Sequence, residues 1–231
     1  MDAEGFSTRA KAWFIGGGPG APDLLTVRAA RVIADADIVI WGGSLGMEQA
    51  VLESAREGVE LMPWPPASMQ DLLGAYERAA AEGLVVARLV GGDPAVYVNM
   101  DEELQYVREL GLAHEIVPGV GALSAAAAAL GRQLVTAGTE EALVIASPKA
   151  GVQGLARLGG TLALYMVGDR GQELQRELLA AGHSGEERCA VTHRLSWPDE
   201  IVFTCRLDEL GERLDEPDLG QQTLVLVGLC A

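Results

Sequence analysis

Short apolar runs alternate with helical patterns through the first half of the chain. The run at 38–41 is continuous, as is typical of a parallel strand buried on both faces. The pattern predicts strands at 12–15, 38–41, 59–62, 85–90 and 114–117, and helices near 25–33, 48–55, 69–82, 101–110 and 122–130. Because strands and helices alternate, we expect a mostly parallel sheet with helices on its faces.

The second half of the chain has shorter helices and more closely spaced strands. Strands are predicted at 142–146, 161–167, 188–193, 201–204 and 222–227, and helices at 172–181 and 207–214. This spacing favours a second domain with a mixed sheet. The expected fold class is therefore α/β with two domains, at 1–138 and 139–231, and a boundary near 137–141.

Composition narrows the class of partner. The 231 residues are 49% hydrophobic and 22% charged, as expected for a globular protein that buries a substantial core. The formal net charge of −16 argues against a nucleic-acid or anionic membrane surface. No stretch approaches the roughly 18 apolar residues of a membrane span, and residues 1–11 lack the apolar core of a secretory signal. A cytoplasmic location is the expectation.

Cysteine and histidine spacing gives no indication of a metal centre. The residues are Cys189, Cys205, Cys230, His114, His183 and His193. Three widely spaced cysteines match neither a zinc nor a redox motif, so we expect free, buried thiols. The histidines are equally scattered, and no metal is expected.

Glycine-rich turns follow four of the predicted strands, at 16–20, 42–43, 91–94 and 118–121. The carboxyl ends of parallel strands share one edge of a sheet, which is where ligands of α/β proteins bind. Turns that are almost free of side chains let a ligand approach the main chain closely. Four such turns in succession predict a ligand cleft at this edge.

The first turn also fits a dinucleotide fingerprint, Gly16-x-Gly18-x-x-Ala21. That site needs an acid at the end of the second strand to bind a ribose hydroxyl. The second strand instead continues as Trp41-Gly42-Gly43-Ser44, and Pro19 interrupts the expected entry into a helix. The sequence therefore does not favour a nicotinamide cofactor.

Four motifs, in order, resemble those of a known family. They are Gly16 to Thr26, with Gly-x-Gly-Pro-Gly followed by Asp-Leu-Leu-Thr, then Gly91-Gly92-Asp93-Pro94, Val117-Pro118-Gly119-Val120 and Leu164-Tyr165-Met166. Together they span nearly the whole chain and resemble the tetrapyrrole methylases. The resemblance implies S-adenosylmethionine (SAM) as methyl donor, a cofactor cleft between two α/β domains, and a homodimer.

Two further stretches point to one branch of that family. Gly43-Ser44-Leu45 and Ser196-Trp197-Pro198-Asp199-Glu200 are similar to segments of the enzymes that methylate precorrin-4 at C-11 in cobalamin biosynthesis. The second stretch is the more specific, because five consecutive residues match. The resemblance implies a SAM-dependent C-methyltransferase that acts on a precorrin.

Two alternatives stay open. A methyltransferase of the same superfamily could act on another precorrin, on uroporphyrinogen III or on the diphthamide precursor of a protein. The chain could also be a non-catalytic SAM-binding homologue, because its loops depart from the family pattern. Gly121 and Ala122, for example, stand where Ser or Thr is common.

Carried over motif by motif, the implied SAM contacts fall mainly on bare turns. They are Pro19, Gly91, Gly92, Asp93, Val96, Gly121, Ala122, Met166, Cys205 and Thr223. Met166 is soft and apolar, which suits an adenine or thioether neighbour. Asp93 can accept a hydrogen bond from an amino or hydroxyl group of the cofactor, although an acid before Pro94 is also an ordinary turn residue.

Methyl transfer from a sulfonium relies on positioning, so no nucleophilic side chain and no metal are expected. The catalytic base, if the reaction uses one, is not identified; Tyr97, Asp101 and Glu103 lie nearest the turns in sequence. Because a tetrapyrrole substrate carries several carboxylates, arginines should line its trough. The candidates for substrate binding are Tyr97, Arg88, Arg132, Arg170 and Arg194.

Overall fold

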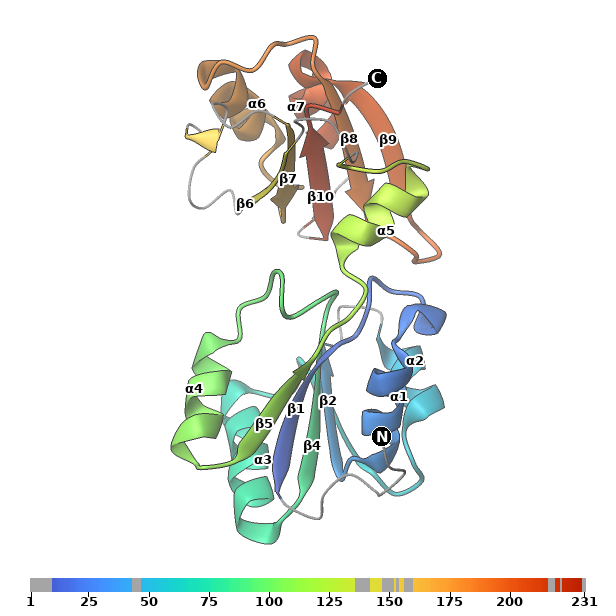
Figure 1. Ribbon diagram of the computed structural model, residues 1–231, viewed down its shortest axis with the longest axis vertical. Helices are drawn as coiled ribbons and strands as arrows, with labels where there is room; N and C mark the ends of the chain where they lie inside the picture. The colour runs from blue at the N-terminus through green and yellow to red at the C-terminus, as the bar shows by residue number, and fades with distance from the viewer. Residues whose placement is uncertain are drawn as a thin grey trace. The chain divides into compact units, whose positions relative to one another are not determined.

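The computed structural model divides into two compact units, Met1–Ala122 and Leu123–Ala231, called here the N-terminal and C-terminal units (Figure 1). It describes residues 10–42, 47–135, 142–146, 152, 154–155, 160–215, 219–220 and 222–229. The division falls at the start of a helix, earlier in the chain than the expected boundary. That expected boundary, near 137–141, lies outside the described residues.

The N-terminal unit is built on one parallel sheet of five strands in the order β3-β2-β4-β1-β5. The strands are β1 (Lys11–Gly16), β2 (Ile38–Gly42), β3 (Glu60–Trp64), β4 (Val85–Val90) and β5 (Ala113–Val117). Its helices are α1 (Val27–Asp35), α2 (Glu48–Ser54), α3 (Met69–Glu82) and α4 (Asp101–Glu109), with a 3₁₀ turn at Pro22–Leu24. The predicted mostly parallel sheet with helices on both faces is confirmed.

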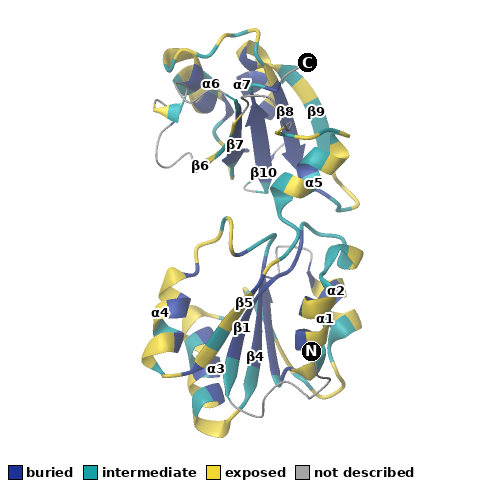
Figure 2. Ribbon diagram, in the orientation of Figure 1, coloured by how far each residue is buried: buried dark blue, intermediate teal, exposed yellow. Residues whose placement is uncertain are grey.

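Successive residues of β1 point to opposite faces of the sheet and so build two cores. Phe14 packs with Leu72 and Tyr76 of α3, whereas Ile15 packs with residues of α1 that include Ile33. Figure 2 shows β1, β2 and β4 buried and the outer surfaces of the helices exposed. A strand that is buried on both faces has no side in contact with solvent. A charged residue inside β4 is therefore unusual.

The first helix begins later than its apolar spacing alone indicates. Pro22 opens a separate 3₁₀ turn, and Thr26 then adopts an extended conformation. The Thr26 hydroxyl accepts a hydrogen bond from the amide of Ala29 at 3.1 Å, which caps α1 at its N-terminus. The chain that leaves the glycine turn after β1 is therefore fixed before the helix starts.

The C-terminal unit carries a mixed five-stranded sheet in the order β6-β7-β10-β8-β9. The strands are β6 (Leu143–Ala146), β7 (Thr161–Tyr165), β8 (Arg188–His193), β9 (Ile201–Arg206) and β10 (Thr223–Val227). Only β6 and β7 pair in parallel; the other neighbours are antiparallel. The predicted mixed sheet is confirmed. The helices are α5 (Ala122–Ala129), α6 (Gly171–Ala180) and α7 (Leu210–Asp215).

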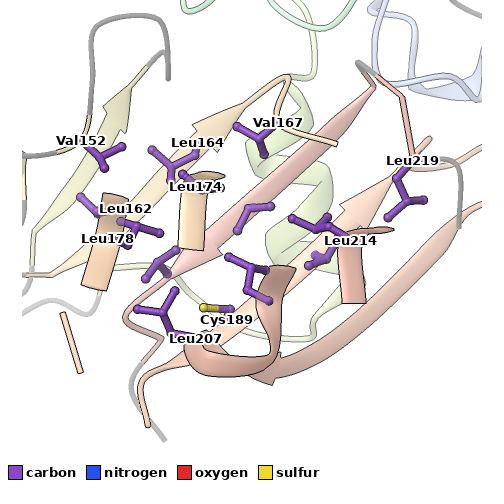
Figure 3. Packing of buried hydrophobic residues seen from close by; sticks show 14 residues of the cluster. Val152, Leu162, Leu164, Val167, Leu174, Leu178, Cys189, Leu207, Leu214 and Leu219 are labelled. Atoms are coloured by element: carbon purple, nitrogen blue, oxygen red, sulfur yellow. The ribbon is translucent and has the colours of Figure 1, made fainter. Parts of the chain in front are cut away.

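One core holds this second sheet against α6 and α7. Figure 3 shows its side chains, among them Leu164, Leu178 and Leu214, between the strands and these helices. The segment predicted as one helix at 207–214 is instead a 3₁₀ turn, Leu207–Glu209, followed by α7. Leu207, Leu210 and Leu214 are all buried, so the break in helix type does not change the face that packs.

Candidate functional site

The glycine turns after β1 and β4 are bonded to each other. Gly18 donates its amide to the carbonyl of Gly92 at 3.3 Å, and Gly92 donates to the carbonyl of Gly18 at 2.8 Å. The Gly17 amide also donates to the carbonyl of Val90 at 2.8 Å. Two of the turns predicted to share an edge are therefore joined by main-chain hydrogen bonds.

The turn after β5 is packed against the same pair. A Cβ on Gly119 would lie 2.3 Å from the carbonyl oxygen of Gly92 and 2.7 Å from the Cα of Gly16. A Cβ on Gly16 would lie 2.5 Å from the Cα of Gly119. No side chain fits into either contact. Three turns therefore form one main-chain surface, called here the glycine junction (Gly16–Gly18, Gly91–Gly92 and Gly119–Gly121).

Asp93 and the start of α5 lie at the edge of the glycine junction. A Cβ on Gly121 would sit 3.6 Å from the Cβ of Asp93, and one on Gly92 would sit 3.7 Å from the amide nitrogen of Ala122. Of the residues expected to contact SAM, Gly91, Gly92, Asp93, Gly121 and Ala122 are thus brought together. Pro19 belongs to the turn that the Gly18–Gly92 bonds hold in place.

Asp93 acts as a turn acid and keeps one oxygen available. Its Oδ1 accepts a hydrogen bond from the amide of Ala95 at 3.0 Å, and its carbonyl accepts from the amides of Val96 and Tyr97. Oδ2 forms no hydrogen bond with any residue that the structure describes. Val96 is 51% exposed beside it. Both interpretations of Asp93 therefore fit: it shapes the turn, and it can still accept a bond from a ligand.

A hollow of about 210 Å³ lies next to Gly91 in the N-terminal unit. Its lining includes Trp64, Met69, Arg88, Val98, Met100 and Glu102, and we call it the Trp64 hollow. Most of these residues follow the carboxyl ends of β3 and β4, so the hollow is on the same edge of the sheet as the glycine junction.

The environment of Arg88 differs from that expected of an arginine that binds a substrate carboxylate. Arg88 is only 4% exposed, and it donates from Nε and Nη2 to the two carboxylate oxygens of Glu103, at 3.0 and 3.1 Å. Its Nη1 donates to the carbonyl of Leu89 at 2.9 Å. The guanidinium is thus engaged by an internal carboxylate, and Arg88 does not stand as an open arginine in a trough.

Glu103 is likewise committed rather than available as a base. Besides Arg88, its Oε2 accepts the hydroxyl hydrogen bond of Tyr76 at 2.9 Å. Burial, followed by the negative charge of Glu103, raises the pKa of Tyr76 well above its ordinary value. Tyr76 therefore stays a neutral donor to the ion pair. Of the three residues considered as a base, only Tyr97 and Asp101 remain candidates.

In the C-terminal unit, Met166 and Thr223 are neighbours. Met166 follows β7 and donates its amide to the carbonyl of Thr223, at the start of β10, at 2.9 Å. Met166 has a φ of 58° and is 42% exposed. A positive φ in a residue other than glycine is strained, and such strain gathers at functional sites. Two of the three positions expected to contact SAM in this unit therefore lie at one sheet edge.

His193 was not singled out by the sequence, yet it contacts Thr223. The Thr223 hydroxyl donates to the carbonyl of Gly220 at 2.8 Å, so its oxygen accepts the hydrogen of His193 Nδ1 at 3.0 Å. Burial and then the charge of Arg194 lower the pKa of His193, with Asp199 acting in the opposite direction. A neutral imidazole that carries its hydrogen on Nδ1 results.

The segment 194–200 folds tightly on the same edge. Arg194 and Ser196 have φ values of 49° and 65°. The Arg194 guanidinium lies 4.0 Å from the ring centre of Trp197 and pairs with Asp199 at 2.5 Å. The expected substrate arginine is thus held in a strained turn by an aromatic ring and a carboxylate, with its side chain partly exposed.

The remaining expected site residues of this unit are Cys205, Arg170 and Arg132. Cys205 of β9 lies opposite Cys189 of β8 in the strand register, and both are free cysteines. This pair is four positions along the strands from the Ile201–His193 pair, and His193 lies opposite Thr223. Burial raises the pKa of the Cys205 thiol to about 11. Arg170 forms ion pairs with Glu173 and Glu177, and Arg132 follows α5, partly buried. The structure does not bring Cys205 to Met166 and Thr223.

Two features named in the sequence analysis fall outside the described residues. They are Gly43-Ser44-Leu45 and Cys230. Within the ranges that are described, no three His, Cys, Asp or Glu side chains cluster as metal ligands would. No helix there is both long and apolar enough to cross a bilayer.

Comparison with known proteins places this site in context. The chain is 32% identical over 225 residues to the precorrin-4 C(11)-methyltransferase of Rhodococcus erythropolis, covering 94% of this chain and 90% of that one. It superimposes on a cobalt precorrin-4 methyltransferase of cobalamin biosynthesis with a TM-score of 0.86, at 27% identity over 95% of each chain.

A second solved structure was determined with the demethylated cofactor. It is the uroporphyrin-III C-methyltransferase of Thermus thermophilus in complex with S-adenosylhomocysteine, with a TM-score of 0.78 and 27% identity over 94% of this chain and 97% of that one. The sequence model of the tetrapyrrole (corrin/porphyrin) methylases matches residues 11–211, which is most of the chain. The resemblance inferred from the motifs is therefore confirmed: this chain belongs to the tetrapyrrole (corrin/porphyrin) methylases.

Proposed function

We propose that this protein transfers a methyl group from SAM to a carbon of a precorrin, namely C-11 of precorrin-4, in cobalamin biosynthesis. The observation that carries the proposal is the glycine junction, where three strand ends meet through main-chain contacts alone. It occurs in a chain whose relatives are named for precorrin-4 methylation. Such a surface can bind an adenosyl group without obstruction by side chains.

Two sets of residues are proposed for the cofactor, one in each unit. The N-terminal set is Pro19, Gly91, Gly92, Asp93, Val96, Gly121 and Ala122, and the C-terminal set is Met166 and Thr223. Asp93 Oδ2 would accept a hydrogen bond from an amino or hydroxyl group, and Met166 would contact the adenine or the thioether. Cys205 is left out, because it lies four strand positions away from the second set.

The chemistry needs geometry more than it needs a reactive side chain. A substrate carbon forms a bond to the sulfonium methyl, the carbon–sulfur bond breaks, and its electron pair stays on the sulfur of S-adenosylhomocysteine. Charge on sulfur disappears as the methyl moves, so little new charge has to be stabilised. Orientation of the two reactants can account for about 7 kcal/mol or more of the barrier.

The decisive experiment combines binding with turnover. Isothermal titration with S-adenosylhomocysteine should give a measurable Kd for the wild-type protein and a weaker one for Asp93→Ala. Labelled SAM should then methylate precorrin-4 in preference to uroporphyrinogen III. Binding without transfer to either acceptor would indicate a non-catalytic homologue, and preference for uroporphyrinogen III would reassign the acceptor. No binding at all would remove the proposal.

We also infer a homodimer in the cytoplasm. The edge strand β5 supports the first part, because most of it is exposed and Ile116 is 41% exposed. An exposed edge strand with an apolar residue is suited to pairing or coverage by another chain. Light scattering should give twice the mass of the 24.3 kDa chain, and a monomer at micromolar concentration would contradict it.

A further inference from the structure

The Trp64 hollow has a lining that the proposed reaction does not yet use. It adjoins Gly91, so a substrate held next to a cofactor at the glycine junction would lie within reach of it. All of its lining residues belong to the N-terminal unit, which fixes its geometry within one compact body. The question is which part of a tetrapyrrole it suits.

Charge in the hollow argues against a carboxylate. Its charged lining residues are Arg88, Glu102 and Glu103. Arg88 has its positive charge balanced by Glu103 at two points, inside the fold. Glu102, by contrast, forms no ion pair with a described residue. A carboxylate entering the hollow would meet this negative charge with no open cation to compensate, at a cost in binding free energy.

Apolar groups make up most of the remaining wall. Trp64, Met100, Val98 and Met69 contribute to it, and the last two are 37% and 42% exposed. Exposed apolar side chains that gather around a concave site mark a place where a ligand covers them. The hollow therefore suits a carbon-rich group that removes Met69 and Val98 from water.

The size of the hollow limits how much of a ligand can enter. Pockets that hold a whole drug-sized ligand measure about 300–1,000 Å³, and this one measures about 210 Å³. It can take an edge of a macrocycle but not the macrocycle itself.

We propose that the Trp64 hollow receives an apolar, methyl-bearing edge of the tetrapyrrole and leaves the carboxylate arms outside. This assignment rests on the proposed function and adds the part of the substrate that the N-terminal unit recognises. It also gives Arg88 a role that differs from the one expected: paired with Glu103, it forms a neutral wall rather than an anion-binding group.

Met69 allows a sharp test, because it is exposed and is the first residue of α3, where substitution disturbs little packing. Met69→Gln keeps the length and the neutrality of the side chain but makes it polar. Met69→Leu keeps it apolar and serves as the matched control. Met69→Lys adds the cation that a carboxylate would favour.

The expected KM for precorrin-4 rises about tenfold in Met69→Gln, which corresponds to the loss of one buried apolar contact. Met69→Leu should stay within about twofold of wild type, and Met69→Lys should be no better than Met69→Gln. The Kd for S-adenosylhomocysteine should not change in any of the three. Melting temperatures should show that all three fold.

Two outcomes would overturn the assignment while leaving the proposed function intact. An unchanged KM in Met69→Gln would show that no apolar group enters the hollow. A KM below the wild-type value in Met69→Lys would show that a carboxylate does. If the wild-type protein neither binds S-adenosylhomocysteine nor transfers a methyl group, the proposed function fails first, and the assignment fails with it.

Discussion

Arg88 in β4 and Glu103 in α4 face each other inside the N-terminal unit and are joined by two hydrogen bonds, of 3.0 and 3.1 Å. Their side chains are only 5% and 6% exposed. The pair links the strand that ends at Val90 to the first turn of the helix that begins at Asp101. The pair therefore holds together the two ends of the loop between β4 and α4, which carries Asp93.

Removing one partner of this pair should destabilise the protein strongly. Arg88→Met leaves Glu103 buried without its cation, and such a change typically costs about 3–5 kcal/mol. Arg88→Met combined with Glu103→Gln removes both charges and keeps an oxygen for the Tyr76 hydroxyl. Urea denaturation followed by circular dichroism should find the double variant more stable than Arg88→Met alone. A loss below about 1 kcal/mol in Arg88→Met would mean that the charge is reached by water.

The glycine junction should tolerate no side chain at its tightest point. Gly119→Ala places a Cβ 2.3 Å from the carbonyl oxygen of Gly92, so main chain has to move. We expect the affinity for S-adenosylhomocysteine to fall at least about tenfold. Gly74→Ala in α3 is the control, because its Cβ would meet no described atom within 4 Å. It should leave affinity unchanged and raise stability by up to about 1 kcal/mol. Equal affinities in the two variants would separate the glycine junction from the cofactor.

Substitutions at opposite ends of the strands of the second sheet should affect cofactor binding differently. Met166→Ala removes a partly exposed side chain beside Thr223 and should weaken binding of S-adenosylhomocysteine several-fold. Cys205→Ala acts at the other end of β9 and should leave the Kd within about twofold of wild type. Calorimetry on both variants decides the matter. A large effect of Cys205→Ala with an intact melting temperature would restore Cys205 to the site.

Stability should depend on pH through His193. Its pKa is lowered in the folded protein from the ordinary 6.5, so the unfolded chain binds the proton first as the pH falls. The free energy of unfolding should therefore decrease as the pH drops below about 6.5, and level off below the folded pKa. Denaturation between about pH 7.5 and about pH 5.5 should show a smaller decrease in His193→Gln. An identical pH dependence in His193→Gln and wild type would contradict the assignment.

Apolar patterning predicted β4 and α4 but not the contact between them. Arg88 is one charge in an otherwise apolar strand, and three acids, Asp101 to Glu103, open the helix. The strand pattern cannot say which acid reaches the arginine. Helical phase offered a clue, because Glu103 is four residues before the buried Val107 and so lies on the inward face.

Strand register decides which of the expected residues of the second unit lie next to each other. The motif around Met166 and the start of β10 were located from sequence, but their contact depends on the pairing of β7 with β10. The same applies to His193, which meets Thr223 only through the register of β8 with β10. Cys205 was expected to contact SAM because of the family resemblance. Such a resemblance does not show which end of a strand lies at the site.

The close approach of Gly16, Gly92 and Gly119 also restricts how this protein can diverge. Because a Cβ at Gly16 or Gly119 would collide with main chain, mutation at these two positions cannot tune acceptor choice. Diversification would have to come from Met69, Val98 and their neighbours, whose side chains reach into open space. An engineer who wants a methyltransferase for a different macrocycle would do best to randomise those positions and leave the turns untouched.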